Sequence, residues 1–242
     1  MFRADGLVRG GFPHGFTSRV SPGSLSATRG ESDEIIVGRW AQVLSTEGLS
    51  PESLVVLNQV HGACVVRVER GDGPLVAVAD ADAVITTRPG VPLSVRVADC
   101  VPLLLAVPGA VAAVHAGWRG TVAEIVPRAV EALCAAADAV PEQVVSAMGP
   151  CIGACCFEVG PEVVAGLGAL LPAADFLREG RGERPHVDLW AANRALLERC
   201  GVQHIETVGP CTACSDELFS YRAEHGVTGR QVGFIALGAS AQ

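Results

Sequence analysis

One long apolar stretch, from Val101 to Val114, constrains the fold more than any other feature of this chain. It is too short to span a membrane, which takes about 20 apolar residues, and Pro102, Pro108 and Gly109 interrupt it. Apolar runs rich in Val and Leu on either side of a Pro-Gly pair are typical of two strands joined by a tight turn. We therefore predict strands at 102–107 and 111–115 that form a hairpin. Against this, Pro-Gly favours a type II turn, which is not the preferred turn of hairpins.

Further strands and helices follow from apolar runs and from start and stop signals. The remaining predicted strands, from β-rich runs, span 54–60, 63–68, 83–86, 93–97, 144–148, 204–208 and 231–237. Thr121 and Glu124 form a predicted capping box at the start of one helix. Gly160-Pro161 opens a second helix, and a third runs from a cap at Asp188 to Gly201. We interpret 18–32 and 178–185 as loops. The pattern indicates an α/β fold with a mixed sheet.

Composition limits the class of protein. The 242 residues are 49% hydrophobic and 18% charged, which favours a folded chain, and we treat 1–242 as a single domain. The net charge of -8 and the absence of an arginine cluster argue against a nucleic-acid partner. No apolar segment follows the first residues, so we expect a soluble cytoplasmic protein without a membrane partner. The oligomeric state is left open.

Cys100 and His115 lie at the open end of the predicted hairpin. Facing residues of such a hairpin have numbers that sum to roughly 215 to 219, so these two side chains fall opposite or diagonal to one another. A cysteine beside a histidine suits either two ligands of one metal ion or a Cys–His catalytic pair. His61 stands where a strand meets Gly62, a common position for a functional side chain. A lone histidine or cysteine at a strand end is nevertheless more often structural.

The other cysteines carry weaker signals. The nine cysteines are an odd number, and a cytosolic chain of this size does not predict a disulfide framework. Cys211 and Cys214 form a single C-x-x-C, which without a second pair is a poor zinc signal. Cys151, Cys155 and Cys156 lie in a glycine-rich segment and suit packing as well as a site. Walker, Rossmann and G-x-S-x-G motifs are missing.

Several short blocks, in order over nearly the whole chain, together resemble one family. They include His14-Gly-Phe-Thr-Ser-Arg19, Asn58-Gln-Val-His-Gly62, Ala98-Asp-Cys-Val-Pro102, His115-Ala-Gly-Trp-Arg-Gly120, Gly149-Pro-Cys-Ile-Gly153 and Phe219-Ser-Tyr-Arg222. The chain resembles the laccase-domain or polyphenol oxidoreductase family, which includes FAMIN-type purine nucleoside phosphorylases and bacterial peptidoglycan editing factors. It departs from the family pattern at 21–33, where a Gly/Ser-rich loop is abbreviated.

The resemblance implies a site, a fold and an activity. It implies a zinc ion held by His61, Cys100 and His115, which are also the expected catalytic residues. It implies a layered α/β domain, with a mixed sheet core flanked by helices, related to Cys–His deamidating toxins. The implied reactions are phosphorolysis of adenosine, inosine, guanosine and methylthioadenosine, with hydrolytic deamination of adenosine as a side activity. We expect Asn58 and Gln59, from the same block as His61, to bind substrate.

Arg119 is our candidate for binding phosphate. It follows His115 closely and precedes the predicted capping box at Thr121, where free backbone N–H groups of a helix start would favour an anion. Its planar guanidinium can hold phosphate through two hydrogen bonds. The alternative is that Arg119 pairs with a surface carboxylate.

Three other functions compete with the phosphorylase. One is a Cys–His amidase acting on peptidoglycan precursors, with Cys100 as nucleophile and His115 as base. Another is a zinc-stabilised interaction module, which a fourth protein ligand such as Cys155 or Cys156 would favour. The third is a polyphenol oxidase of the laccase type. The six histidines are too few for the histidine-rich copper clusters of such an oxidase.

Overall fold

The predicted hairpin forms the centre of a six-stranded sheet. The computed structural model describes residues 1–27, 30–179 and 184–238. Strands β7 (Val101–Val107) and β8 (Ala110–Ala116) pair antiparallel, with Val101 facing Ala116 and Val107 facing Ala110. This register lies within the predicted range. The two-residue turn between them uses Gly109 at φ +89°, a backbone conformation that glycine adopts without strain.

The central sheet is mixed and has the strand order β12-β9-β7-β8-β5-β3. The outer members are β12 (His204–Thr207) and β9 (Val145–Met148) on one side, and β5 (Ala83–Thr86) and β3 (Val65–Arg67) on the other. The β12–β9 and β3–β5 pairs are parallel, whereas the inner pairs are antiparallel. Every residue of β7 and β8 is buried, which is the reason their sequence is apolar without alternation.

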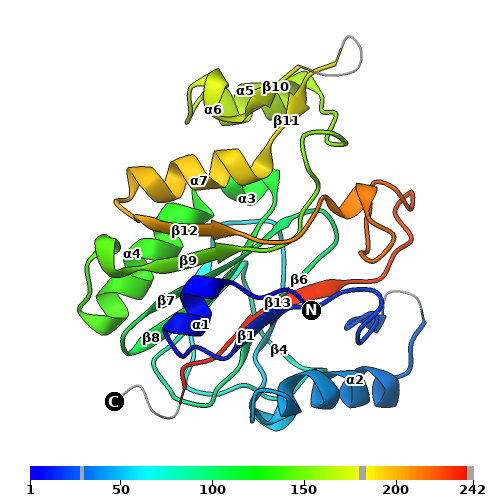
Figure 1. The fold of residues 1–242 in the computed structure, drawn as a ribbon, viewed down its shortest axis with the longest axis vertical. Coiled ribbons are helices and arrows are strands. Elements are labelled where there is room, and N and C mark those ends of the chain that lie inside the picture. The colour runs from blue at the N-terminus through cyan, green and yellow to red at the C-terminus, as the bar shows by residue number, and fades with distance from the viewer. Residues whose placement is uncertain (28–29, 180–183, 239–242) are drawn as a thin grey trace.

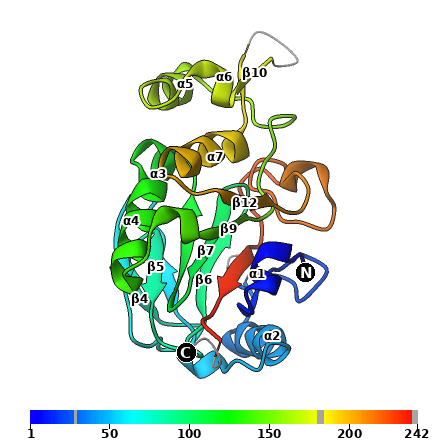
Figure 2. The same ribbon diagram turned by 60° about the vertical axis from the view of Figure 1, so that its left-hand side comes forward.

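Helices cover one face of this sheet (Figures 1 and 2). Side chains that alternate along β7, such as Leu103 and Leu105, pack in one core with α4 (Ile125–Ala137) and α7 (Leu189–Arg199). The short helices α3 (Trp118–Val122), α5 (Pro161–Gly168) and α6 (Ala173–Phe176) lie on the same side. The two-residue strands β10 (Leu177–Arg178) and β11 (His186–Val187) pair next to them.

The opposite face packs against a second, smaller sheet. Strands β1 (His14–Phe16), β13 (Gln231–Ile235) and β6 (Leu93–Val97) form it, and α1 (Asp5–Arg9) joins the same core. Helix α2 (Asp33–Ser45) buries Trp40 in a third cluster, beside the parallel pair β2 (Val56–Asn58) and β4 (Ala77–Asp80). Figure 2 shows α4 and α1 on opposite sides of the central sheet.

The layered α/β fold with a mixed sheet agrees with the prediction from the sequence. All the predicted strands are present, although 54–60 shortens to β2 and 63–68 to β3. The helix starts at Pro161 and at the Asp188 cap are confirmed, since the Asp188 side chain accepts from Ala191 N at 2.9 Å. In the described part of 18–32, Ser18 and Pro22 form an isolated bridge and Ala27 has 3-10 conformation, while residues 28–29 lie outside the described ranges. Of 178–185, residues 180–183 lie outside them too.

Two corrections concern helices. The capping box at Thr121 is wrong: Thr121 lies inside α3, and its hydroxyl donates to the backbone oxygen of Gly117 at 3.0 Å. The next helix, α4, starts only after Glu124, which is left-handed at φ 62°. The predictions from sequence also omitted α1, α2, α6, β1, β4, β10 and β11, and Arg178, predicted to start a loop, ends β10. Among the described helices, none is long and apolar enough to cross a membrane.

Candidate active site

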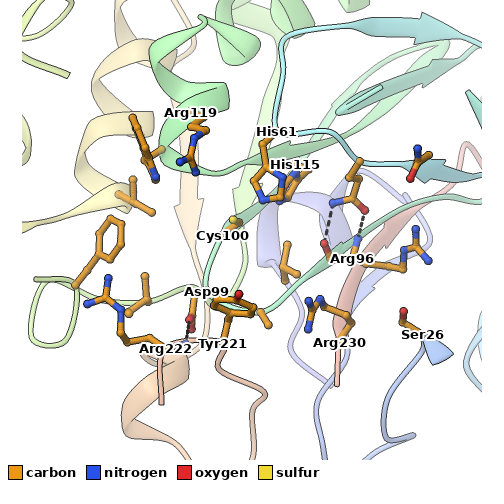
Figure 3. A pocket seen from close by; sticks show the side chains of 18 residues that line it. Ser26, His61, Arg96, Asp99, Cys100, His115, Arg119, Tyr221, Arg222 and Arg230 are labelled. Carbon is orange, nitrogen blue, oxygen red and sulfur yellow. Dashed lines mark hydrogen bonds between the residues drawn. The ribbon is translucent and has the colours of Figure 1, made fainter. Parts of the chain in front are cut away.

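Three predicted site residues from separate segments meet at the open end of the hairpin (Figure 3). His61 follows β2, Cys100 directly precedes β7, and His115 lies within β8. One nitrogen of each histidine and the cysteine sulfur all lie within 4.8 Å of one another. The two imidazole rings meet edge to face, with centroids 4.8 Å apart. The hairpin register thus brings Cys100 and His115 together as predicted, and the turn after β2 adds His61.

Asp82 organises this group, and sequence reasoning did not identify it. Its buried carboxylate accepts hydrogen bonds from the backbone N–H groups of His61 (3.0 Å) and Gly62 (2.7 Å). It also accepts from Nδ1 of His115 at 2.7 Å. These contacts hold His61 at φ 60°, a conformation that is unfavourable for a residue other than glycine. One aspartate therefore fixes the positions of both histidines.

Charge is stabilised within the group. Burial alone would raise the pKa of the Cys100 thiol, but the adjacent His115 and His61 outweigh it and lower this pKa to about 6. Burial alone would lower the pKa of His115, but Cys100 and Asp82 raise it to about 9. A cysteine thiolate is therefore favoured, and thiolates rather than thiols are nucleophiles and metal ligands.

The residues present fit a zinc ion. Two imidazoles and one thiolate are donors that zinc prefers, and three protein ligands leave a position for substrate, as in catalytic zinc sites. A carboxylate on the second nitrogen of a ligating histidine, as Asp82 is on His115, is the usual outer partner in such sites. Gly117 leaves the sulfur accessible, because a Cβ there would lie 2.8 Å from Sγ of Cys100.

Asp99, next to Cys100, is held in an unusual conformation. Its φ is +91°, and its carboxylate accepts from the Thr212 hydroxyl at 2.6 Å and from the backbone N–H of Arg222 at 2.7 Å. The segment from 211 to 222 is thereby tied to the residue beside the thiol. This link joins parts of the chain more than 100 residues apart, so local patterns did not predict it.

The group opens into a cavity of about 600 Å³. Apolar and aromatic side chains form part of its wall: Trp118, Ile152, Phe157, Leu189 and Tyr221. Four arginines also line it: Arg96, Arg119, Arg222 and Arg230. None of the four forms an ion pair with the residues that the structure describes. In a chain of net charge -8, this cavity concentrates positive charge.

The other predicted site residues line the same cavity, but their side chains make different contacts there. Arg119 lies inside α3, stacks over Trp118 with its Cζ 4.4 Å from the ring centroid, and points toward the cavity (Figure 3). Asn58 donates to Asp80 at 2.8 Å. Both amide atoms of Gln59 bond the main chain of Arg96, each at 2.8 Å. Gln59 therefore connects β2 to β6, and a substrate role for Asn58, Gln59 and Arg119 stays a prediction.

A second cysteine group lies apart from this centre. Cys155, Cys156, Cys211 and Cys214 have their sulfur atoms within 4.8 Å of one another. Cys155 and Cys156 therefore join the C-x-x-C pair, which on its own is a poor zinc signal. Neither of them joins the His61 group as a fourth ligand.

Fold and site define an α/β protein with a two-histidine, one-cysteine centre at the base of an arginine-lined cavity. Comparison with known proteins gives its family: the chain belongs to the multi-copper polyphenol oxidoreductase laccase family, which it matches over residues 13–238. The expected resemblance is confirmed.

Curated relatives and solved structures agree with this assignment. The chain is 38% identical to a purine nucleoside phosphorylase of Deinococcus radiodurans over 98% of its own length and 92% of the relative's. It is 43% identical to the purine nucleoside phosphorylase SCO2081 of Streptomyces coelicolor over 88% and 87% of the two chains. The crystal structure of YlmD from Geobacillus stearothermophilus matches with a TM-score of 0.88 at 32% identity, covering 97% of this chain and 94% of that one.

Proposed function

We propose that this protein is a zinc-dependent purine nucleoside phosphorylase acting on adenosine, inosine, guanosine and methylthioadenosine, with adenosine deaminase as a side activity. One observation carries the proposal: the cavity combines the His61–Cys100–His115 centre with arginines and apolar walls. Phosphorolysis needs an anion site beside a pocket for a flat base, and both kinds of surface are present. The printed names of the relatives support the same reaction.

His61, Cys100 and His115 are the proposed zinc ligands and catalytic residues. Bound zinc would supply Lewis-acid chemistry, polarising a substrate oxygen or activating water. Asp82 would hold His115 with its Nδ1 protonated, so that its other nitrogen faces the metal. Copper chemistry of the laccase type is disfavoured, because only two of the six histidines line the cavity.

Phosphate binding is assigned to the arginines. In the reaction, a phosphate oxygen forms a bond to C1′ of the ribose while the bond from C1′ to the purine nitrogen breaks, and the purine leaves with the electron pair. Arg119 is our first candidate for holding the phosphate, because its guanidinium donates no hydrogen bond to a described residue, whereas Arg96, Arg222 and Arg230 each donate to a backbone oxygen. The helix start lies at Trp118 and not at Thr121, so Arg119 is in the first turn of the five-residue helix α3 and does not precede a helix.

A flat purine would lie against the apolar and aromatic wall. Trp118, Phe157 and Tyr221 offer ring surfaces there. Tyr221 has 56% of its surface accessible, so its ring is free to contact a ligand that enters the cavity. We propose that these rings, rather than a set of polar groups, give the cavity its tolerance for several purines.

The test is a nucleoside panel assayed with and without phosphate on zinc-loaded protein. We expect base release from inosine and guanosine only with phosphate, and inosine from adenosine in both conditions. Variants of Tyr221 would separate binding from chemistry, because Tyr221→Ala should raise KM more than it lowers kcat. Absence of turnover on every nucleoside would refute the proposal.

A second candidate is favoured by one specific observation. Cys100, His115 and Asp82 are connected in the order of a nucleophile, a base and its orienting carboxylate. This arrangement suits an amidase acting on peptidoglycan precursors. The effect of zinc distinguishes the amidase from the phosphorylase, because a zinc-bound thiolate is a poor nucleophile. An amidase would be inhibited by zinc and labelled at Cys100 by an alkylating reagent. The phosphorylase needs the metal.

A further inference from the structure

We propose that Cys155, Cys156, Cys211 and Cys214 form a second metal site, a structural zinc site with four thiolate ligands. The four residues come from two segments, the stretch after β9 and the 3-10 turn η4 (Thr212–Cys214) with the residue before it. All four sulfur atoms lie within 4.8 Å of one another, and none of the four cysteines forms a disulfide bond.

The spacing suits a single tetrahedral ion. Zinc–sulfur bonds of about 2.3 Å place the sulfur atoms of a tetrahedral site roughly 3.8 Å apart. Sγ of Cys214 lies 3.5 Å from Sγ of Cys155 and 3.3 Å from Sγ of Cys156. Small shifts would bring these distances to the value for zinc. An iron–sulfur cluster would need its ligands spread around several metal atoms, so the compact group favours one ion.

Backbone contacts prepare the same group. The N–H of Gly153 donates to Sγ of Cys211 at 3.1 Å, a contact typical of thiolate ligands. A Cβ at Gly153 would come within 3.2 Å of Cys211 and 3.3 Å of Cys155, so glycine leaves room where the two cysteines converge. The N–H of Thr212 donates to the backbone oxygen of Cys151 at 2.9 Å. The two segments therefore run side by side, as the views in Figures 1 and 2 agree.

The site would brace one wall of the cavity. Thr212, between two of the four cysteines, donates its hydroxyl to Asp99, the neighbour of Cys100. Ile152, three residues before Cys155, lines the cavity and donates its N–H to the backbone oxygen of Asp99. An ion joining the two segments would hold both contacts in place. Its role is thus to position the wall, without touching substrate.

The test is the zinc content per chain, measured by elemental analysis on protein purified under reducing conditions. We expect two zinc ions in the parent and one in His61→Ala, which keeps the four-cysteine site. Cys214→Ser should also lose one, while the matched control Cys64→Ser, an exposed cysteine outside both groups, should keep two. These counts do not depend on turnover, so the proposal can fail while the phosphorylase proposal stands, and the reverse.

Cobalt gives a second readout that leaves the cysteines unchanged. In cobalt-loaded His61→Ala, four thiolates should produce a strong thiolate-to-cobalt charge-transfer band and the intense visible bands of tetrahedral cobalt. Any of four results would overturn the proposal. They are a weak charge-transfer band, a single zinc in the parent that His61→Ala removes, iron in the purified protein, and an intact protein mass that shows a disulfide within the four-cysteine group.

Discussion

Replacing Asp82 by asparagine tests whether this buried carboxylate organises the metal centre. One carboxylate oxygen accepts from His61 N and His115 Nδ1, and the other accepts from the N–H groups of Val60 and Gly62. When the new NH₂ group faces His61 N and His115, the imidazole can change tautomer and accept from it, so the backbone N–H of His61 is the group left without an acceptor. Each orphaned N–H costs about 1–3 kcal/mol, so we expect metal-free Asp82→Asn protein to lose about 1–3 kcal/mol of unfolding free energy.

Metal affinity should fall as well, because His115 loses its charged outer partner. Loss of such a partner typically costs 10–100-fold in metal affinity, which is about 1.4–2.7 kcal/mol. Competition with a chelator measures the change in metal affinity, and denaturant unfolding measures the loss of unfolding free energy. The matched control is Asp80→Asn, since Asp80 accepts a side-chain hydrogen bond only from Asn58 among the described residues and should change neither quantity much. If Asp82→Asn behaves like Asp80→Asn in both assays, the central role of Asp82 is refuted.

Three further predictions concern the phosphate site, the space beside Cys100 and acid stability. Arg119→Lys should raise the apparent phosphate constant about tenfold or more, because a charge-assisted contact is worth about 1.5–3 kcal/mol, and deamination should be affected less. Unchanged phosphate kinetics in Arg119→Lys, or the same effect only in Arg230→Lys, would move the anion site to the Arg96 and Arg230 side. Gly117→Ala should weaken zinc binding, because its Cβ would meet Sγ of Cys100. The control Gly38→Ala, in α2 with open space around it, should stabilise the fold by about 0.5–1 kcal/mol. Equal zinc affinity in the two variants would contradict the predicted clash at Gly117. The hydrogen bond from Arg3 lowers the pKa of Glu47 below its ordinary value of 4.5, so the stabilisation from this pair is complete above pH 4.5 and is lost as the pH falls below it. Glu47→Gln should therefore flatten the acid side of a plot of thermal-unfolding temperature against pH. An unchanged plot would show that the pair contributes nothing.

Local sequence patterns, namely apolar runs on either side of a turn, were sufficient to predict the central sheet. The paired apolar runs around Pro108-Gly109 determine both the strands and their register, since a two-residue turn leaves little freedom. That register is sufficient by itself to place Cys100 and His115 near one another. By contrast, β1 and β4 are three and four residues long and lack a clear pattern, and α2 mixes exposed Ile35 and Val37 with its buried face.

Parts of the site depend on contacts that local patterns do not contain. Asp82 directly precedes β5, and in the sequence it is an ordinary strand-flanking residue; only the folded chain brings the backbone of His61 against it. The four-cysteine group needs Cys155 and Cys156 to meet Cys211 and Cys214 across more than 50 residues. The capping box failed because Thr121 bonds back to Gly117, four residues earlier, within a helix that had already begun.

Zinc titration of metal-free protein tests the proposed zinc-dependent phosphorolysis most directly. Phosphate-dependent release of hypoxanthine from inosine is followed as zinc is added, with Cys100→Ser in parallel. We expect no turnover without metal, a rise to a plateau as the His61–Cys100–His115 centre fills, and no rise in Cys100→Ser. Full turnover in metal-free protein, or equal turnover in Cys100→Ser, would contradict a catalytic role for zinc at this centre.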